Sequence, residues 1–135
     1  MTIFVDTSVW SLALRRDSVP DQPEVRRLRD ALSGGELIHT TGIVLQELLQ
    51  GCRGPRAWER IVERFGALPL LVPSSDDHIN AALLRNNCRH HGIQVGTIDA
   101  LLAQLCISRE LTMLSTDQDF SHIADWTPLQ FWRKS

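Results

Sequence analysis

The sequence predicts an α/β protein of three layers, α/β/α, in which a central parallel β-sheet lies between two layers of helices. Short apolar stretches that can form strands alternate along the chain with longer segments of helical periodicity. Strands separated by helices pair in parallel, because each helix carries the chain back to the end of the sheet where the previous strand began. The length of 135 residues fits one domain, 1–135, with a single substantial core.

Strands are expected where short apolar runs are bounded by polar or turn-forming residues. They cover residues 2–5, 36–40, 68–73, 111–116 and, as a final or edge strand, 127–132. Parallel sheets of this kind hold their functional sites at the carboxyl ends of the strands, near the point where the strand order reverses. Polar residues directly after strands are therefore the first candidates for a site.

Helices are expected where apolar residues recur three or four positions apart. They cover residues 8–16, 23–32, 41–51, 55–66, 76–92, 97–110 and 117–126. Pro23 suits the first turn of its helix, and Ser75 and Thr97 are expected to cap the helices that follow them. Glycines that cannot extend a helix favourably predict helix ends, namely Gly34, Gly35, Gly51 and Gly92.

The composition excludes several classes of protein. A net charge of −2 argues against a protein that coats nucleic acid by bulk electrostatics, and no apolar run is long enough to span a membrane. Of the 14 basic residues only Lys134 is not arginine, and arginine binds phosphate through a planar fork of donors, although most exposed arginines are simply solvated. No signal peptide precedes the first strand, so a cytoplasmic location is expected.

Three cysteines lack the spacing of a disulfide framework or a zinc site. Cys52, Cys88 and Cys106 are odd in number and far apart, and no C-x-x-C pair occurs. We expect them to be reduced thiols in a reducing compartment.

Acidic residues gather where the predicted architecture puts a site. Asp6 follows the first strand, Asp117 and Asp119 follow the strand over 111–116, Asp99 lies in the first turn of a helix, and Glu47 lies within an otherwise largely apolar helix. Each has an ordinary structural alternative, since acids at helix N-termini are stabilised by the helix dipole and Glu47 could be solvated. Asp6 is harder to explain in that way, because a carboxylate at the end of a central strand is a charge near the core.

Converging carboxylates would repel one another unless a divalent cation held them. Oxygen ligands suit Mg²⁺ or Mn²⁺, which retain waters and bridge to phosphate oxygens. None of the histidines is paired with another at zinc-ligand spacing next to these acids, at positions 39, 78, 90, 91 and 122. The sequence therefore favours a site for a hard cation over a zinc site.

Four segments carry these acids in order between residue 3 and about residue 123: FVDTSVW, TGIVLQELLQG, GTIDALLAQLC and LTMLSTDQDFSHI. Together they resemble the acidic motifs of the PIN-domain family, and particularly those of VapC-like ribonuclease toxins from type II toxin–antitoxin systems. Asp6, Glu47, Asp99 and Asp117 match the family's four acids in that order. Residues 52–90 match only in their general helical character.

The resemblance implies an Mg²⁺-dependent endoribonuclease, with Mn²⁺ as a substitute, in which metal-activated water cleaves RNA phosphodiester bonds. Asp6, Asp99 and Asp117 would hold the metal, and Glu47 and Asp119 would bind it through waters or act as a base. Small hydroxyl residues beside the site are Ser8, Thr97 and Thr116, of which Thr116 could also cap a helix or donate a hydrogen bond. Single-stranded RNA is the expected substrate, because its splayed backbone can enter a narrow cleft.

Two other functions fit parts of the sequence. A phosphatase could use Asp6 as a covalent nucleophile, but Ser8 stands where that chemistry wants a second acid, and the only lysine is at the far end of the chain. A non-catalytic interaction module would use its acids only to cap helices, although Glu47 within a helix argues against it.

The resemblance also implies a cognate antitoxin and a homodimer. Two apolar stripes could supply either interface, although such stripes more often face the core. They are Trp10, Leu12 and Leu14, and Trp58, Ile61 and Phe65. An antitoxin segment is expected to lie across apolar grooves and to place an Arg or Lys in the acidic cluster.

Overall fold

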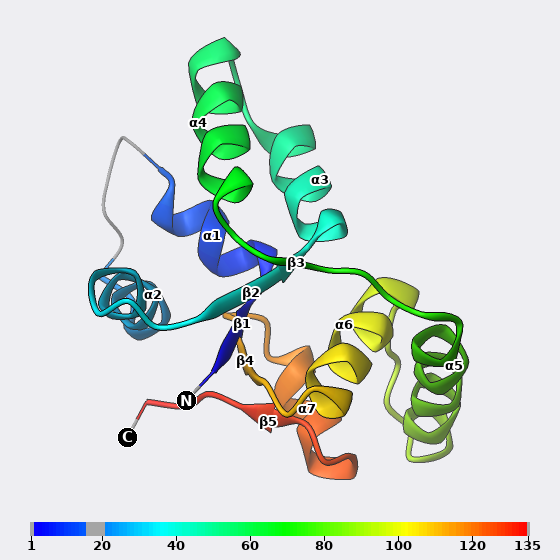
Figure 1. The fold of residues 1–135 in the computed structure, drawn as a ribbon. Coiled ribbons are helices and arrows are strands. Elements are labelled where there is room, and N and C mark those ends of the chain that lie inside the picture. Colours follow the sequence, from blue (N-terminus) through cyan, green and yellow to red (C-terminus); the bar gives the residue numbers. More distant parts are fainter. Residues whose placement is uncertain (1, 16–20, 135) are drawn as a thin grey trace.

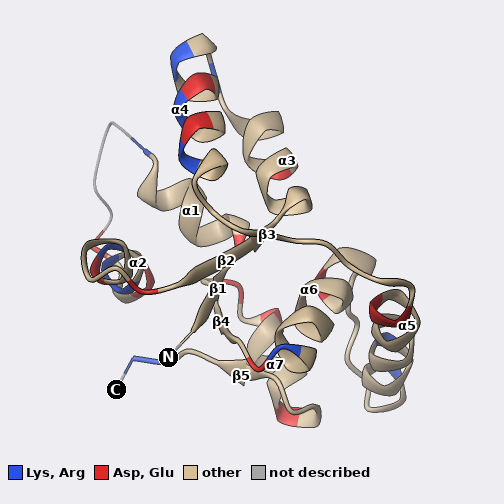
Figure 2. Ribbon diagram, viewed as in Figure 1, with Lys and Arg blue, Asp and Glu red and all other residues tan. Residues whose placement is uncertain are grey.

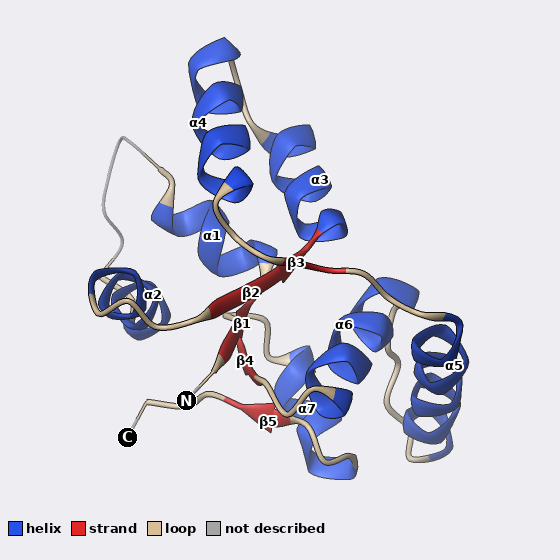
Figure 3. Ribbon diagram, in the orientation of Figure 1, coloured by secondary structure: helices blue, strands red, loops and turns tan. Residues whose placement is uncertain are grey.

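The computed structural model describes residues 2–15 and 21–134 (Figures 1 and 3). The elements alternate along the chain in the order β1 (Ile3–Val5), α1 (Thr7–Ala13), α2 (Pro23–Ser33), β2 (Ile38–Thr41), α3 (Gly42–Gly51), α4 (Pro55–Gly66), β3 (Leu70–Leu71), α5 (Ser75–His90), α6 (Thr97–Ser108), β4 (Thr112–Leu114), α7 (Asp119–Trp126) and β5 (Gln130–Phe131).

All five strands form one parallel sheet in the order β3-β2-β1-β4-β5. Ile3 is in register with Ile38 of β2 on one side and with Thr112 of β4 on the other. The residues of β1 and β4 are all buried, as expected for central strands that are covered on both faces. The predicted fold class, a parallel sheet within a three-layer α/β/α architecture, is confirmed.

The strand order reverses between the neighbouring strands β1 and β4, because the connections on either side of this pair run in opposite directions across the sheet. It moves from β1 to β2 and β3 through α1–α4, then crosses back to β4 and β5 through α5–α7. Because crossovers between parallel strands are right-handed, opposite directions of travel put the helices on opposite faces. Figure 1 shows this separation, with α1–α4 on one side of the sheet and α5–α7 on the other. The carboxyl ends of β1 and β4 therefore meet at the switch point.

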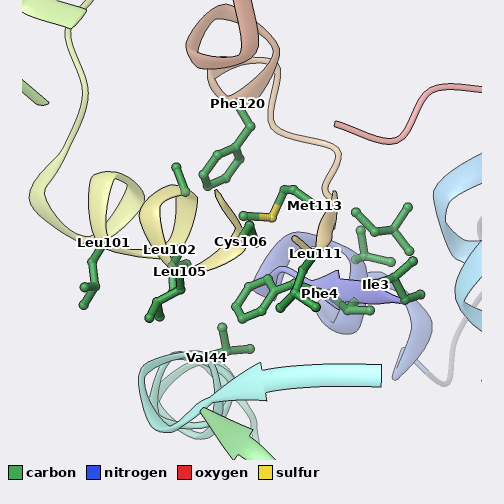
Figure 4. Packing of buried hydrophobic residues seen from close by; sticks show 14 of the residues in the cluster. Ile3, Phe4, Val44, Leu101, Leu102, Leu105, Cys106, Leu111, Met113 and Phe120 are labelled. Carbon is green, nitrogen blue, oxygen red and sulfur yellow. The ribbon is translucent and has the colours of Figure 1, made fainter. Parts of the chain in front are cut away.

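The core fills the space between the sheet and both helical layers. Phe4 and Met113 are paired neighbours on β1 and β4, and Figure 4 shows them with Leu105 and Cys106 of α6. All four side chains are fully buried. Full burial of a large apolar side chain contributes roughly 1.5–3 kcal/mol, so these contacts fix the strand ends that carry the polar residues described below.

Several predicted boundaries change by a few residues. The strands are shorter than expected, and the predicted helix over 8–16 begins at Thr7 and ends at Ala13, with residue 16 outside the described part of the chain. Gly51 is the last residue of its helix instead of the residue that stops it. Pro23 in the first turn of α2 and Gly92 beyond α5, with a φ of 78°, are confirmed.

The predicted caps at Ser75 and Thr97 are wrong. Ser74 caps α5, because its hydroxyl accepts from the Asp77 N–H (3.2 Å) while the Asp77 carboxylate accepts from the Ser74 N–H (2.8 Å). This reciprocal capping box needs an acid three residues after the cap, which Ser74 has and Ser75 lacks. Gly96 occupies the cap position of α6 without a side chain, and Thr97 is the first helical residue.

One of the two apolar stripes proposed for an interface belongs largely to the core. Trp10 and Phe65 pack against each other with ring centroids 5.0 Å apart, and Ile61 is buried beside them. Only Trp58 of these residues is half-exposed, at 50%. Trp10, Ile61 and Phe65 therefore join α1 to α4 within one chain and are not available to a second subunit.

The helices differ in character from membrane spans. Within residues 2–15 and 21–134, no helix combines the length and apolar composition that crossing a bilayer requires.

Candidate active site

Asp6 lies directly after β1 with its carboxylate almost fully buried, since the residue is 7% exposed. Its N–H donates to the Leu114 carbonyl (3.0 Å), which extends the pairing of β1 with β4 by one residue. The carboxylate does not cap α1, although Asp6 occupies the cap position. It accepts instead from the hydroxyls of Ser8 (3.0 Å) and Ser115 (2.8 Å), both at Oδ2. Helix capping therefore does not explain this buried charge.

Two serines join the ends of the central strands. The Ser8 and Ser115 hydroxyls lie 3.2 Å apart, the Thr116 N–H donates to Ser8 Oγ (3.1 Å), and the Asp117 N–H donates to Ser115 Oγ (3.0 Å). Ser8 was predicted beside the site and contacts Asp6. Ser115 was missed, although a hydroxyl residue directly after the apolar run LTML was a usable signal.

Asp99, Asp117 and Asp119 come together from two parts of the chain. Asp99 lies in the first turn of α6, Asp117 follows β4 and Asp119 begins α7, yet one carboxylate oxygen of each lies within 4.8 Å of the others. The Asp119 N–H donates to Asp117 Oδ1 (2.9 Å), which holds the loop between β4 and α7 in a tight turn. Three of the predicted acids are thus brought together, and Asp119 was correctly grouped with them in space.

Glu47 reaches the same region from α3. It is exposed, and its carboxylate accepts from the Thr7 hydroxyl (2.8 Å), next to Asp6 in the chain. Thr7 was not predicted, although it follows Asp6 in the segment VDTS. The expected cap by Thr116 is wrong, because Gln118 holds the cap position of α7 and Thr116 contributes only its backbone N–H.

The cluster is strongly negative. The pKa of Asp99 is raised to about 6, first because the carboxyl is partly buried and then because Asp6, Asp117, Asp119 and Glu47 all repel its charge. Figure 2 shows acidic positions on α3 and α6. In the part of the chain that the structure describes, ion pairs join only Arg26 to Asp21, Arg27 to Glu36 and Arg109 to Asp77, so none involves these five acids.

The donor set fits a hard divalent cation. Three carboxylate oxygens within 4.8 Å match the all-oxygen ligand sets of Mg²⁺ and Mn²⁺, and no histidine or cysteine belongs to the group. The raised pKa of Asp99 marks a site where negative charge lacks a counter-ion. Such a site can bind a cation and, through it, a phosphate group.

The fold and the site together describe a parallel α/β/α protein with an acidic cluster at its topological switch point. Such a cluster is suited to cation-assisted chemistry on phosphates. The sequence model of the PIN domain matches residues 3–125. The chain therefore belongs to the PIN-domain family. A comparison with curated protein sequences finds no match.

Solved structures share the fold along nearly the whole chain. The chain is similar to a protein in the VapBC2 complex of Rickettsia felis bound to a promoter DNA fragment (TM-score 0.77, 18% identity, 100% of both chains). It is also similar to a protein in the DNA-bound VapBC complex from Salmonella typhimurium (TM-score 0.72, 23% identity, 98% of both chains). A third similar structure is the sarcin–ricin loop cleaving toxin VapC20 of Mycobacterium tuberculosis (0.66, 18%, 94% of this chain and 98% of that one).

Proposed function

We propose that the chain is a divalent-cation-dependent endoribonuclease and the toxin of a toxin–antitoxin pair. The observation that carries the proposal is the convergence of Asp99, Asp117 and Asp119, with Asp6 and Glu47 close enough to repel Asp99, in a site without a basic partner among the described residues. Membership of the PIN-domain family and the likeness to a sarcin–ricin loop cleaving toxin support the same assignment.

Asp99 and Asp117, two of the three carboxylates that lie together, would hold the cation with Asp6 beside them. Asp119, the third carboxylate of that group, would contact it directly or through water, and Glu47 through water. When bound, Mg²⁺ or Mn²⁺ supplies positive charge to the scissile phosphate and lowers the pKa of water. Ser8 and Ser115 keep the Asp6 carboxylate in one orientation by donating to the same oxygen, Oδ2, which leaves Oδ1 free. Thr7 restrains Glu47 in the same way.

Glu47 and Asp119 are the proposed bases. Both are more exposed than Asp6, so either can take a proton from attacking water and release it to solvent. The closely held aspartates position the phosphate and orient it for in-line attack. The family's small hydroxyl positions at Thr97 and Thr116 remain predicted supporting residues, and Thr116 would act through its backbone.

The experiment is to incubate the purified protein with total RNA, with and without Mg²⁺, and to map the new ends. Sequence-selective cuts that require Mg²⁺ support the ribonuclease. Release of inorganic phosphate from small phosphomonoesters, without RNA cuts, would instead support an aspartyl-phosphate mechanism at Asp6. The absence of both activities, with the antitoxin complex intact, would favour a non-catalytic interaction module.

An antitoxin partner is proposed because the chain resembles proteins solved in VapBC complexes. An Arg or Lys from that partner would neutralise the acidic cluster and exclude the cation. Apolar contacts elsewhere would supply most of the affinity, since a charge pair at an open cleft is partly screened. Replacing that basic residue with Ala should restore RNA cleavage while most of the binding remains. Severe loss of binding, with inhibition preserved wherever the antitoxin still binds, would indicate a steric block instead.

The homodimer also remains a proposal. Half of the side chains first considered for it are buried, namely Trp10, Ile61 and Phe65, while Trp58 is half-exposed and Leu12 and Leu14 are partly accessible. Ile79 and Leu83 lie one turn apart on α5 and are 58% and 61% exposed, with Val72 before the helix 80% exposed. A second copy could cover this apolar surface. Light scattering at micromolar concentration tests it: the parent should be a dimer and Leu83→Glu a monomer. A monomeric parent would refute the dimer. A cytoplasmic location is proposed with the rest of this function.

A further inference from the structure

A cavity of about 620 Å³ lies between α1, α3 and α4, and it shares residues with the acidic site. Thr7 and Glu47, which hydrogen-bond to each other beside Asp6, also line this cavity. The cavity is therefore a direct continuation of the candidate active site. Its size is within the range of pockets that bind small molecules or single side groups of polymers.

The charge of the cavity is opposite to that of the acidic cluster. Arg15, Arg53 and Arg60 line it, and Glu47 is its one acidic lining residue. None of these three arginines takes part in an ion pair within residues 2–15 and 21–134. Figure 2 shows basic segments on α4 close to the acidic position on α3. The chain thus places unpaired guanidinium groups around a hollow that opens beside a proposed phosphate-cleaving site.

Most of the remaining lining is apolar, with Thr7 and Ser11 as polar exceptions. Leu14, Leu48 and Ile61 supply hydrocarbon surface, without an aromatic residue among the lining side chains. A nucleotide has a planar, weakly polar base and an anionic phosphate, so it can use both parts of such a cavity. Arginine forks bind phosphate, and guanidinium planes also stack on bases.

Resting on the ribonuclease function proposed above, we propose that this cavity is a subsite for a nucleotide flanking the scissile phosphate of single-stranded RNA. Arg53 and Arg60 bind its phosphate, and the apolar wall takes its base or sugar. When the scissile phosphate of an RNA strand lies at the acidic cluster, each neighbouring nucleotide of the RNA places a further phosphate nearby. Because Thr7 and Glu47 line the same cavity as the arginines, a strand that leaves the acidic cluster through this cavity would bring a phosphate past them.

A second cavity with arginines does not have the same character. It measures about 570 Å³ and is lined by Arg85 and Arg89 near the start of α6. Arg85 donates to the Val95 carbonyl (2.7 Å) and Arg89 to Asn86 (2.9 Å), so both guanidinium groups already bond to the chain.

Cys52 provides a direct probe of occupancy, because it is a half-buried free thiol in the lining of the proposed subsite. Cys88 and Cys106 are buried and serve as internal references. The full chain carrying Asp99→Asn, which should not cleave, is mixed with a short single-stranded RNA and treated with N-ethylmaleimide. Modification of Cys52 should slow about tenfold at RNA concentrations of about ten times Kd, because protection follows the occupied fraction.

The arginine variants test which groups bind the strand. Arg53→Ala and Arg60→Ala should each raise KM for RNA with kcat nearly unchanged, and should each reduce the slope of log affinity against log salt by about 0.7. Arg53→Lys should recover the salt slope but not all of the affinity, because lysine lacks the planar fork. Arg29→Ala is the matched control, since this exposed arginine on α2 does not line the cavity.

The outcomes separate this inference from the proposed function. Metal-dependent cleavage with an unchanged KM in both alanine variants and an unprotected Cys52 overturns the subsite while the ribonuclease stands. Protection of Cys52 without any cleavage supports the RNA subsite and refutes the catalytic proposal. Protection by the antitoxin protein and none by RNA overturns the inference, because the cavity would then be a protein-binding groove.

Discussion

Asp77 and Asp99 occupy the same position in consecutive helices but have opposite electrostatics. Each is the third residue of its helix, α5 or α6, and thus lies near the positive end of the helix dipole. The pKa of Asp77 is lowered to about 2, chiefly by the Arg109 guanidinium and then by the Ser74 N–H. That of Asp99 is raised to about 6 by burial and by four acidic neighbours.

The difference lies in the partners. Arg109 binds both Asp77 oxygens, at 3.2 and 3.1 Å, and thereby joins the end of α6 to the beginning of α5. Asp99 has Gly96 at its cap position, which offers no side chain, and has no ion-pair partner among the described residues. Asp77 is neutralised by its own chain, whereas Asp99, in the proposed cation site, has no cationic partner among the described residues. Four changes test this contrast.

The largest effect is expected on activity. Asp99→Asn should reduce RNA cleavage at least about 100-fold. The variant lacks a proposed ligand of the cation that would stabilise negative charge on the reacting phosphate. Asp6→Asn and Asp117→Asn should do the same. Asp77→Asn is the matched control and should leave kcat within about twofold. Single-turnover cleavage measures the activity of each variant, and circular dichroism checks that it is folded. Near-parent activity in an aspartate variant would remove that residue from the site.

For stability, the larger loss is expected from replacing Asp77 and not from replacing Asp99. Asp77→Ala removes the carboxylate half of the capping box of α5 and the partner of Arg109, and should lower the free energy of unfolding by about 2 kcal/mol. The stabilisation by Asp77 should be complete above about pH 4 and lost as pH falls towards about 2, because its pKa is lowered in the folded state. Urea unfolding measures both. Equal destabilisation by Asp99→Ala would contradict the contrast.

Without a divalent cation, Asp99 should make the folded state less stable as pH rises. A raised pKa means that the folded protein holds its proton more tightly, so stability is highest below about pH 4 and falls through about pH 6, by about 1–2 kcal/mol. Asp99→Asn should flatten this dependence. Saturating Mg²⁺ should raise Tm of the parent at pH 7.5 more than that of the variant. A parent whose stability is flat between pH 4 and 7 would argue against the repulsion.

The smallest effect should come from giving α6 the cap of α5. Gly96→Ser introduces a side chain where a Cβ meets no atom within 4 Å and where φ is −69°, so it should fit. A serine there should form a capping box with Asp99 and stabilise the protein by a few tenths of a kcal/mol. It should also draw the carboxylate away from the cation and weaken Mg²⁺ binding, measured by calorimetry. Unchanged Mg²⁺ affinity would show that a capping hydrogen bond to Asp99 does not interfere with cation binding.

Much of the site could be predicted from local sequence. Asp6 was recognisable because a charge directly after an apolar strand is costly, and Glu47 because it interrupts an apolar helix. Ser115 and Thr7 were missed, because their one signal, a hydroxyl residue near the end of a strand, also has many ordinary explanations. Ser8 and Ser115 are 107 positions apart, and only their shared contact with Asp6 gives Ser115 its role.

The sequence alone determined the alternation of strands and helices, and with it the parallel sheet and the end of the sheet that holds the acids, because these follow from short-range periodicity and right-handed crossovers. The tertiary structure decided the electrostatics. Asp77 and Asp99 have the same residue type and the same position in their helices, and they differ in their surroundings: Arg109 and the Ser74 N–H for Asp77, and burial with four nearby carboxylates for Asp99. Coulombic energy depends on distance in space, which local sequence does not encode.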